Sequence, residues 1–222
     1  TWEVAELARV LIERGDLAAA REMLGEARAH GAHSVPAHSL RRARVELMLA
    51  EGRHADAAAG AEEYAGHLRG IDNPAFAPWR SLTALALDAG GRTAEALALA
   101  EEELALARRW GSPGAVGRSL RIAGALAREE GLARLKEAIA VLEGSSARLE
   151  LARALSARGA ALRRAGRRVE AREPLLRALD LAHRCGAARL AEGIREELRA
   201  AGARPRVTAL SGPGSLTPSE RR

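Results

Sequence analysis

The chain has 222 residues, a net charge of +6, one cysteine and 47% apolar residues. This length exceeds that of a disulfide-stapled mini-protein and suffices for one core or a short repeat array. Aromatic residues make up only 2%, which argues against an all-β fold, because sheets draw on aromatic and β-branched side chains. With Cys185 as the single cysteine, no internal disulfide can form, and we expect a cytoplasmic protein.

Glycines divide the chain at regular intervals. One set recurs every 35 to 40 residues, and a second follows it by 16 to 20 residues. The segments between them are rich in Ala, Leu, Glu and Arg, which favour helices. Glycine ends a helix readily because it enters the left-handed region without strain. The first set is Gly15, Gly52, Gly91, Gly131, Gly166 and Gly202, and the second is Gly31, Gly70, Gly111 and Gly186.

The pattern predicts repeated units of helix, glycine turn, helix and glycine turn. Apolar residues share one face in the first unit at Leu7, Ala8 and Leu11, with helical spacing. The predicted helices span 1–14, 17–30, 36–50, 53–69, 75–89, 92–110, 115–130, 133–143, 146–165, 168–185 and 187–201.

This skeleton resembles the tetratricopeptide repeat, whose period is about 34 residues. The resemblance covers residues 1–202 and implies an all-α, right-handed solenoid of about five helix pairs plus a capping helix. The usual aromatics of the family are mostly replaced by Leu and Ala, and the fourth unit is irregular after Gly131. An irregular helical bundle is the alternative.

The composition changes after the last repeat. Residues 203–215 are rich in Arg, Pro, Gly and Ser and predict a linker. Thr217, Pro218 and Glu220 then match an N-cap, a first-turn proline and a capping-box glutamate, with Leu216 as a hydrophobic staple. Only two residues follow, so we expect residues 216–222 to be the truncated start of a further domain of a longer protein.

The order Leu-Thr-Pro-Ser-Glu-Arg at 216–221 is similar to the opening of the LuxR-type helix-turn-helix domain. The strings at 91–97, 135–143, 159–166 and 179–186 resemble the repeat region of the large ATP-binding regulators of the LuxR family. The resemblance implies a sensor or scaffold module of a transcriptional regulator. The module would bind a protein, a peptide or a small effector, and DNA would be contacted only through the absent C-terminal domain. A general protein-interaction or oligomerisation module is the alternative.

Sequence motifs for catalysis or cofactors are absent. No Gly-x4-Gly-Lys-Ser/Thr motif and no Gly-x-Ser-x-Gly elbow occurs, so we expect neither a cofactor nor an enzymatic activity. His30, His33 and His38 lie across a predicted turn without His-x3-His spacing, so no metal site is expected. Residues 101–103, three glutamates, are interpreted as a solvated helix surface.

Two apolar features have structural interpretations. Phe76 and Trp79 are expected to anchor an irregular entry into the third unit. The face around Leu7 and Leu11 is expected to be uncapped and to support a weak homodimer. The sequence contains no run of eighteen apolar residues that would predict a membrane span, and no membrane partner is expected.

Charge is distributed unevenly. Residues 1–112 carry 13 basic and 17 acidic side chains, whereas residues 113–206 carry 20 and 11. In the tetratricopeptide family the first helix of each pair lines the concave side. Projecting the pattern gives a candidate surface for an acidic partner, or for DNA near the attached domain. This surface comprises Arg118, Arg121, Arg128, Arg153, Ser156 and Arg163. The corresponding set in units one to three is mixed: Arg9, Glu13, Arg42, Glu46, Ser81 and Asp88. A solvated Arg-rich face is the alternative.

Overall fold

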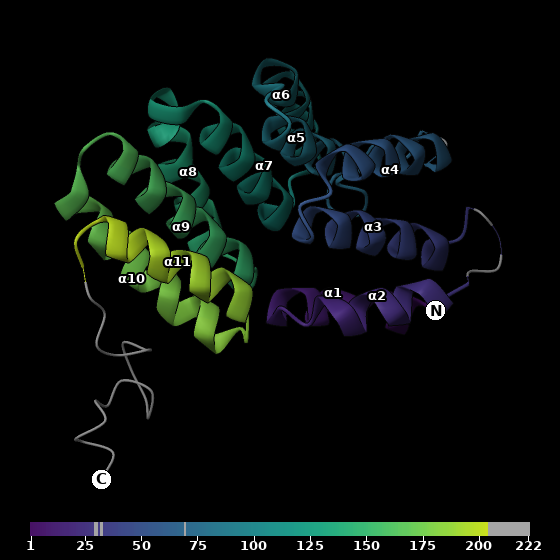
Figure 1. The fold of residues 1–222 in the computed structure, drawn as a ribbon. Helices are drawn as coiled ribbons and strands as arrows, with labels where there is room; N and C mark the ends of the chain where they lie inside the picture. The colour runs from purple at the N-terminus through teal and green to yellow at the C-terminus, as the bar shows by residue number, and fades with distance from the viewer. Residues whose placement is uncertain (29–30, 32, 69, 204–222) are drawn as a thin grey trace, which may run out of the picture. The chain divides into compact units, whose positions relative to one another are not determined.

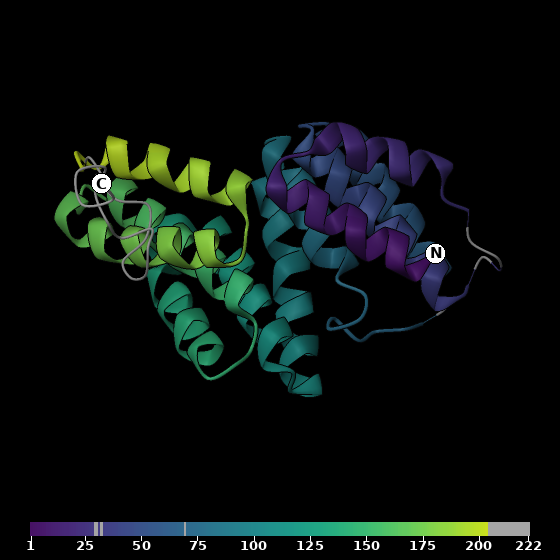
Figure 2. The same ribbon diagram turned by 90° about the horizontal axis from the view of Figure 1, so that it is seen from below.

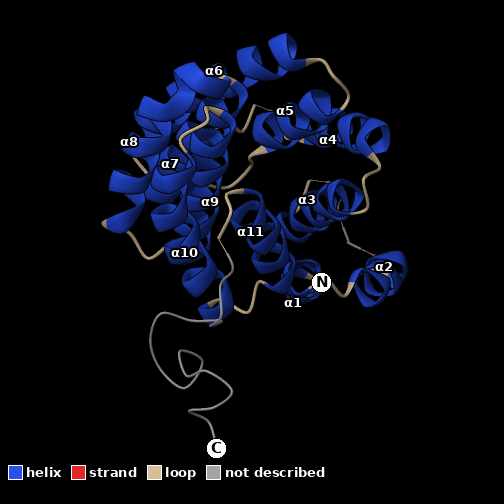
Figure 3. Cartoon of the chain, turned by 60° about the vertical axis from the view of Figure 1, so that its left-hand side comes forward, coloured by secondary structure: helices blue, strands red, loops and turns tan. Residues whose placement is uncertain are grey.

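The computed structural model describes residues 1–28, 31, 33–68 and 70–203, apart from the side chains of residues 128 and 129. In these residues the regular structure is entirely helical, with no strand (Figures 1 and 3). The predicted linker beyond Ala203, the helix start at 216–222 and His30 lie outside the described residues.

Two compact units divide the chain, Thr1–Ala115 and Val116–Arg222. Helix α7 spans the boundary at Pro113–Leu126. The first unit contains α1 (Trp2–Arg14), α2 (Leu17–Glu26), α3 (Val35–Ala50), α4 (His54–His67), α5 (Trp79–Ala89) and α6 (Thr93–Trp110). The second contains most of α7, the 3-10 helix η1 (Arg128–Gly131), α8 (Leu132–Glu143), α9 (Arg148–Arg164), α10 (Arg168–Arg184) and α11 (Ala188–Ala200). The all-α prediction is confirmed.

Successive helices pack as neighbours inside each unit. In the first unit α1 contacts α2 and α3, and α4 lies between α3 and α5 (Figure 1). In the second unit α9, α10 and α11 contact one another and lie side by side (Figure 2). Each unit is therefore a stack of helix pairs. No helix within the described ranges is both long enough and apolar enough to cross a membrane.

Glycine turns end most of the helices, as the spacing predicted. Gly15 adopts a φ of 86° and its N–H bonds to the carbonyl of Ile12, while the N–H of Asp16 bonds to that of Leu11. Gly131 is the exception, with a φ of −76°. Its bare Cα instead packs against the Gly124 backbone, where a Cβ would collide with the carbonyl oxygen. This close approach requires glycine for space rather than for dihedral freedom.

Three predicted helix boundaries, at residues 30, 75 and 130, were wrong by four residues each. Helix α2 ends at Glu26 because Ala27 is extended. The Arg44 guanidinium donates hydrogen bonds to the carbonyl oxygens of Leu24 and Ala27 at this end. Helix α5 begins only after Pro78, because the residue before a proline is disfavoured from helical geometry. Helix α7 ends at Leu126, before the 3-10 turn that brings Gly131 to α7.

Small residues let paired helices approach, and leucines fill the space between pairs. In the first unit Ala5 and Ala8 of α1 pack with Leu24 and Leu40 in one buried cluster. In the second unit Gly159 lies against Leu175, and a Cβ there would stand 2.6 Å from Leu175 Cδ2. These contacts explain the alternation of small and large apolar residues in the sequence.

Candidate functional site

Four of the five predicted arginines, and Ser156, lie on the first helices of the pairs in the second unit. We name the surface formed by α7, α9 and α11 the first-helix face. Arg118 and Arg121 stand one turn apart on α7, and Arg153 and Ser156 stand one turn apart on α9. Arg163 lies further along α9, and all five side chains are half-buried. The predicted place of Arg128 on a first helix is wrong, because α7 ends at Leu126 and Arg128 begins η1. Its side chain is outside the described part.

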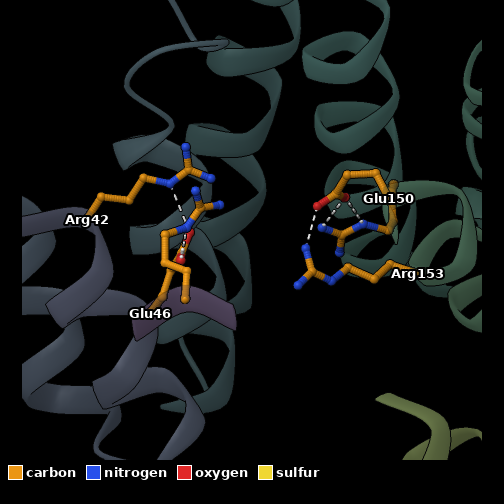
Figure 4. Close-up of polar contacts among 6 residues, drawn as sticks. Arg42, Glu46, Glu150 and Arg153 are labelled. Atoms are coloured by element: carbon orange, nitrogen blue, oxygen red, sulfur yellow. Dashed lines mark hydrogen bonds and ion pairs between the residues drawn. The ribbon is translucent and has the colours of Figure 1, made fainter. Parts of the chain in front are cut away.

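Glu150 occupies the centre of the predicted basic surface. Its Oε2 accepts hydrogen bonds from Arg121 Nε at 3.2 Å and Nη2 at 3.1 Å, across from α7 to α9. Its Oε1 accepts from Arg153 Nη1 at 2.5 Å (Figure 4). Burial opposes ionisation, but the positive charges of Arg121, Arg153 and Arg118 outweigh it and lower the pKa of Glu150 to about 2. The carboxylate is therefore charged at neutral pH.

A second ion pair continues this arrangement to α11. Arg163 Nε donates to Glu197 Oε2 at 2.5 Å and Nη2 donates to Oε1 at 3.2 Å. The bond to Glu197 is the main cause of a raised pKa for Arg163. Such two-point contacts fix the plane of the guanidinium. The first-helix face is thus a set of arginines held in place by carboxylates.

The first unit carries the same kind of cluster. Glu46 of α3 accepts from Arg9 Nε of α1 at 2.7 Å and from Arg42 Nε, one turn earlier on α3, at 2.9 Å (Figure 4). Arg9 also donates to Glu6 at 2.7 Å. Arg42 and Arg9 lower the pKa of Glu46 against the opposing effect of burial. Two arginines sharing one glutamate therefore recur on the first helices of both units.

Sequence reasoning missed a buried carboxylate. The glutamate run 101–103 was expected to be solvated, yet Glu103 is only 1% exposed. It accepts hydrogen bonds from the Ser81 backbone N–H at 2.9 Å and from the Ser81 hydroxyl. Ser81 is itself buried, so its predicted place among the side chains that line the concave side is wrong. The spacing of Ala96, Ala100 and Glu103 on one helical face was the available signal.

The remaining members of the mixed set stay near the surface. Asp88 is exposed and accepts from Thr93 Oγ1 at 2.7 Å, and Glu13 is half-buried on α1. Leu7 is 50% exposed, as expected of an uncapped face, whereas Leu11 packs against the core cluster of the first unit. The apolar surface of α1 therefore includes Leu7 but not Leu11.

Histidines gather near the α3–α4 pair. His33 Nδ1 lies 3.0 Å from the carbonyl oxygen of His67. His38 is buried, with its ring 5.9 Å from that of Phe76 and 6.1 Å from that of Tyr64. Burial lowers the pKa of His38, and the Arg41 charge adds to this, so the ring is neutral at neutral pH. Within the described ranges, no three His, Cys, Asp or Glu residues are grouped to hold a metal ion.

An aromatic cluster and a free cysteine lie apart from these groups. Phe76 and Trp79 pack against a cluster that contains Tyr64, so their anchoring role is confirmed. Arg80 stacks on the Trp79 ring at 4.4 Å from its centroid. Cys185, just after α10, is an exposed free thiol.

Known proteins resemble this chain in fold rather than in sequence. No protein-family model and no curated protein matches it. The structure of BtubC (BKLC) from P. vanneervenii is similar, with 17% identity and a TM-score of 0.54, over 94% of this chain and 84% of that one. Two structures of TPR-like repeats assigned to a kinesin light chain of Podosopora anserina share 18% identity, over 82% of this chain and 94% of theirs, with TM-scores of 0.48 and 0.49.

The fold class follows from the helix pairs and from the BtubC similarity. The chain has a tetratricopeptide-like helical repeat fold, as the glycine spacing predicted. Folds of this kind typically serve as protein–protein interaction modules, because stacked repeats build extended binding surfaces.

Proposed function

We propose that the chain is a non-catalytic repeat module that binds an acidic segment of a partner protein on the first-helix face of the second unit. The arrangement around Glu150 is the observation that supports this most directly. One carboxylate there faces Arg118, Arg121 and Arg153. The cluster therefore has a net charge of +2 at neutral pH.

Arg121 retains hydrogen-bonding capacity for a partner. A guanidinium has five N–H donors in a fixed plane. The bonds to Glu150 use Nε and Nη2 of Arg121, so its Nη1 can bond a carboxylate of an incoming chain. The Ser156 hydroxyl, one turn after Arg153, supplies a further polar contact.

Binding of a labelled oligo-glutamate peptide, followed by fluorescence anisotropy, tests this proposal. Ser156→Glu places a negative charge on the face without removing an ion pair, and we expect it to weaken binding severalfold. Arg167→Gln is the matched control, because Arg167 pairs only with its neighbour Glu170 on an exposed turn. Equal affinities for Ser156→Glu and the unaltered chain would refute the proposed site. An oligo-lysine peptide should not bind.

The resemblance at 216–221 and in the repeat strings supports a finer proposal. According to this proposal, the chain is the sensor or scaffold module of a LuxR-type transcriptional regulator in the cytoplasm. DNA anisotropy at two salt concentrations tests it by comparing the chain with a form extended past Arg222. DNA binding by the extended form alone supports the regulator. If both forms bind DNA equally well and with a steep salt dependence, the basic second unit contacts the phosphates directly. No binding by either would favour a general interaction module.

We also infer weak self-association through α1. Leu7, Val10 and Trp2 are each about half exposed on this helix. Single exposed apolar residues are common, but Leu7 and Val10 are three residues apart and so lie on the same side of the helix. Sedimentation velocity of Leu7→Glu should show less dimer than the unaltered chain, and a monomeric profile for both would contradict the inference.

A further inference from the structure

A groove lies on the side of the first unit formed by its second helices. It has a volume of about 250 Å³ and opens between the C-terminal end of α2 and helix α4, with α3 as its floor. Leu40, Val45 and Met48 supply apolar atoms to the floor, and Gly60 of α4 leaves one wall without a side chain. A Cβ at Gly60 would stand 3.4 Å from Val45 Cγ2, in ordinary contact.

Helix α3 separates this groove from the first-helix residues of the same unit. Arg42 and Glu46 form the ion-paired cluster with Arg9. Arg44 lies two residues after Arg42, and Met48 lies two residues after Glu46. Two residues turn an α-helix by about 200°, so the later pair points to the opposite side. One helix thus directs two sets of residues to opposite sides. All residues that line the groove belong to the first unit, so the groove shares no residue with the first-helix face of the second unit.

Three guanidiniums and one carboxylate line the groove. Arg28, Arg41 and Arg44 contribute the positive charges, and Glu63 of α4 contributes the negative charge. Burial lowers the pKa of Arg44, and repulsion from Arg28 and Arg41 lowers it further, against the attraction of Glu63. The groove therefore has a positive potential that its own carboxylate does not balance.

The end of α2 fixes two of these arginines in position. Arg44 Nη2 donates to the carbonyls of Leu24 and Ala27, both at 3.0 Å. Arg28 Nη1 donates to the carbonyls of Gly25 at 2.6 Å and Ala27 at 3.1 Å. These bonds use Nη2 of Arg44 and Nη1 of Arg28. Because the side chains are already held, an anion that bonds their other nitrogens loses less conformational entropy.

The volume limits what can enter. Pockets that enclose a drug-sized ligand measure roughly 300–1,000 Å³. A half-open groove of about 250 Å³ is smaller, and it suits one or two side chains of a peptide. An apolar floor below a positive rim matches a side chain such as leucine with carboxylates beside it.

We propose that this groove binds an acidic peptide segment, which inserts one apolar side chain between α3 and α4 and pairs its carboxylates with Arg28, Arg41 and Arg44. The apolar side chain fills the space beside Gly60. The flanking carboxylates fix the direction of the peptide along the rim. This is a second interaction surface, with a requirement for an apolar residue that the first-helix face does not impose.

Three labelled peptides test the proposal on the full chain by fluorescence anisotropy. The first carries a leucine between two glutamates on each side, the second replaces the glutamates by lysine, and the third replaces the leucine by serine. We expect the first to bind and each of the others to bind at least about tenfold more weakly. Failure of the first peptide to bind at about 1 mM would overturn the proposal.

Variants then assign the site. Gly60→Leu fills the groove and should abolish binding, whereas Gly66→Leu on the same helix, with no atom within 4 Å, should leave it unchanged. Glu63→Gln removes the competing carboxylate and should tighten binding a fewfold. This exposed variant keeps the test decisive if Gly60→Leu does not fold.

The two proposed surfaces can fail separately. If Ser156→Glu reduces binding of the leucine peptide and Gly60→Leu does not, the peptide occupies the first-helix face. That outcome refutes the groove and supports the proposed function. If Gly60→Leu alone reduces binding, the groove stands whether or not the first-helix face binds oligo-glutamate.

Discussion

Replacing Glu150 by glutamine should destabilise the second unit in a pH-dependent way. The three arginines lower the pKa of Glu150 from 4.5 to about 2. Since each pKa step of one corresponds to 1.36 kcal/mol, the charged carboxylate stabilises the folded state by about 3 kcal/mol relative to the neutral form. Glu150→Gln imitates the neutral form and should lose about this amount at pH 7.

The sign of the pH dependence follows from the lowered pKa. The stabilisation is complete above the unfolded-state pKa and is lost as the pH falls toward about 2. The difference in unfolding free energy between the unaltered chain and Glu150→Gln should therefore shrink to about 1 kcal/mol at pH 3. Urea unfolding followed by circular dichroism at both pH values measures it.

The aromatic residues allow the two units to be distinguished. Trp2, Trp79 and Trp110 all belong to the first unit, and no Trp, Tyr or Phe occurs after residue 115. Because Glu150 and its arginine partners belong to the second unit, Glu150→Gln should shift the circular dichroism transition more than the tryptophan fluorescence transition. Glu46→Gln should shift the fluorescence transition instead, because Glu46 pairs with Arg9 and Arg42.

A matched control separates pairing from charge alone. Glu170→Gln breaks an ion pair with Arg167 in which both side chains are about half exposed, and it should not change the unfolding midpoint. If Glu150→Gln behaves like this control, or if its effect is the same at pH 3 and pH 7, the three-arginine account of Glu150 is wrong.

Four further predictions concern packing and burial. Gly159→Ala should destabilise the second unit by about 1–3 kcal/mol in urea unfolding, because its Cβ meets a leucine of α10 at 2.6 Å. Gly193→Ala, with no atom within 4 Å, should stabilise the same unit by about 0.5–1 kcal/mol. Glu103→Ala leaves the buried Ser81 N–H of α5 without its acceptor and should lower the free energy of unfolding by about 1–3 kcal/mol. The substitution Glu102→Ala at the exposed neighbouring position should not lower it. Tyr64, the single tyrosine, should ionise near pH 12 in an ultraviolet titration and near 10 after unfolding, because burial raises its pKa to about 12.

The sequence predicts the helices well because their ends are local events. A glycine in the left-handed region, such as Gly15 or Gly166, stops a helix through its own backbone and needs no distant partner. Gly131 has the same spacing for a different reason, since it makes room for the Gly124 backbone. That reason depends on a contact between α7 and the following turn, which no local pattern encodes.

The helices that carry most of the candidate residues were predictable, but the pairing of those residues was not. Helical periodicity places Arg121 and Arg153 on the first helices. It does not show that both bind Glu150, because the Arg121 contact joins residues 29 apart in the chain. Glu103 illustrates the opposite case, since its spacing with Ala96 and Ala100 marks a buried face that a run of three glutamates concealed.

Pairing changes what the basic composition implies for binding. A partner carboxylate at the first-helix face must compete with Glu150 and Glu197, which already hold the arginines at hydrogen-bond distance. A single small anion gains little from such a site. A peptide with several carboxylates can bridge the clusters around Arg121 and Arg163 at once, and it meets side chains whose orientation is already fixed. Held arginines therefore favour extended acidic segments over isolated anions, which makes selectivity between them the sharpest measure of the proposed function.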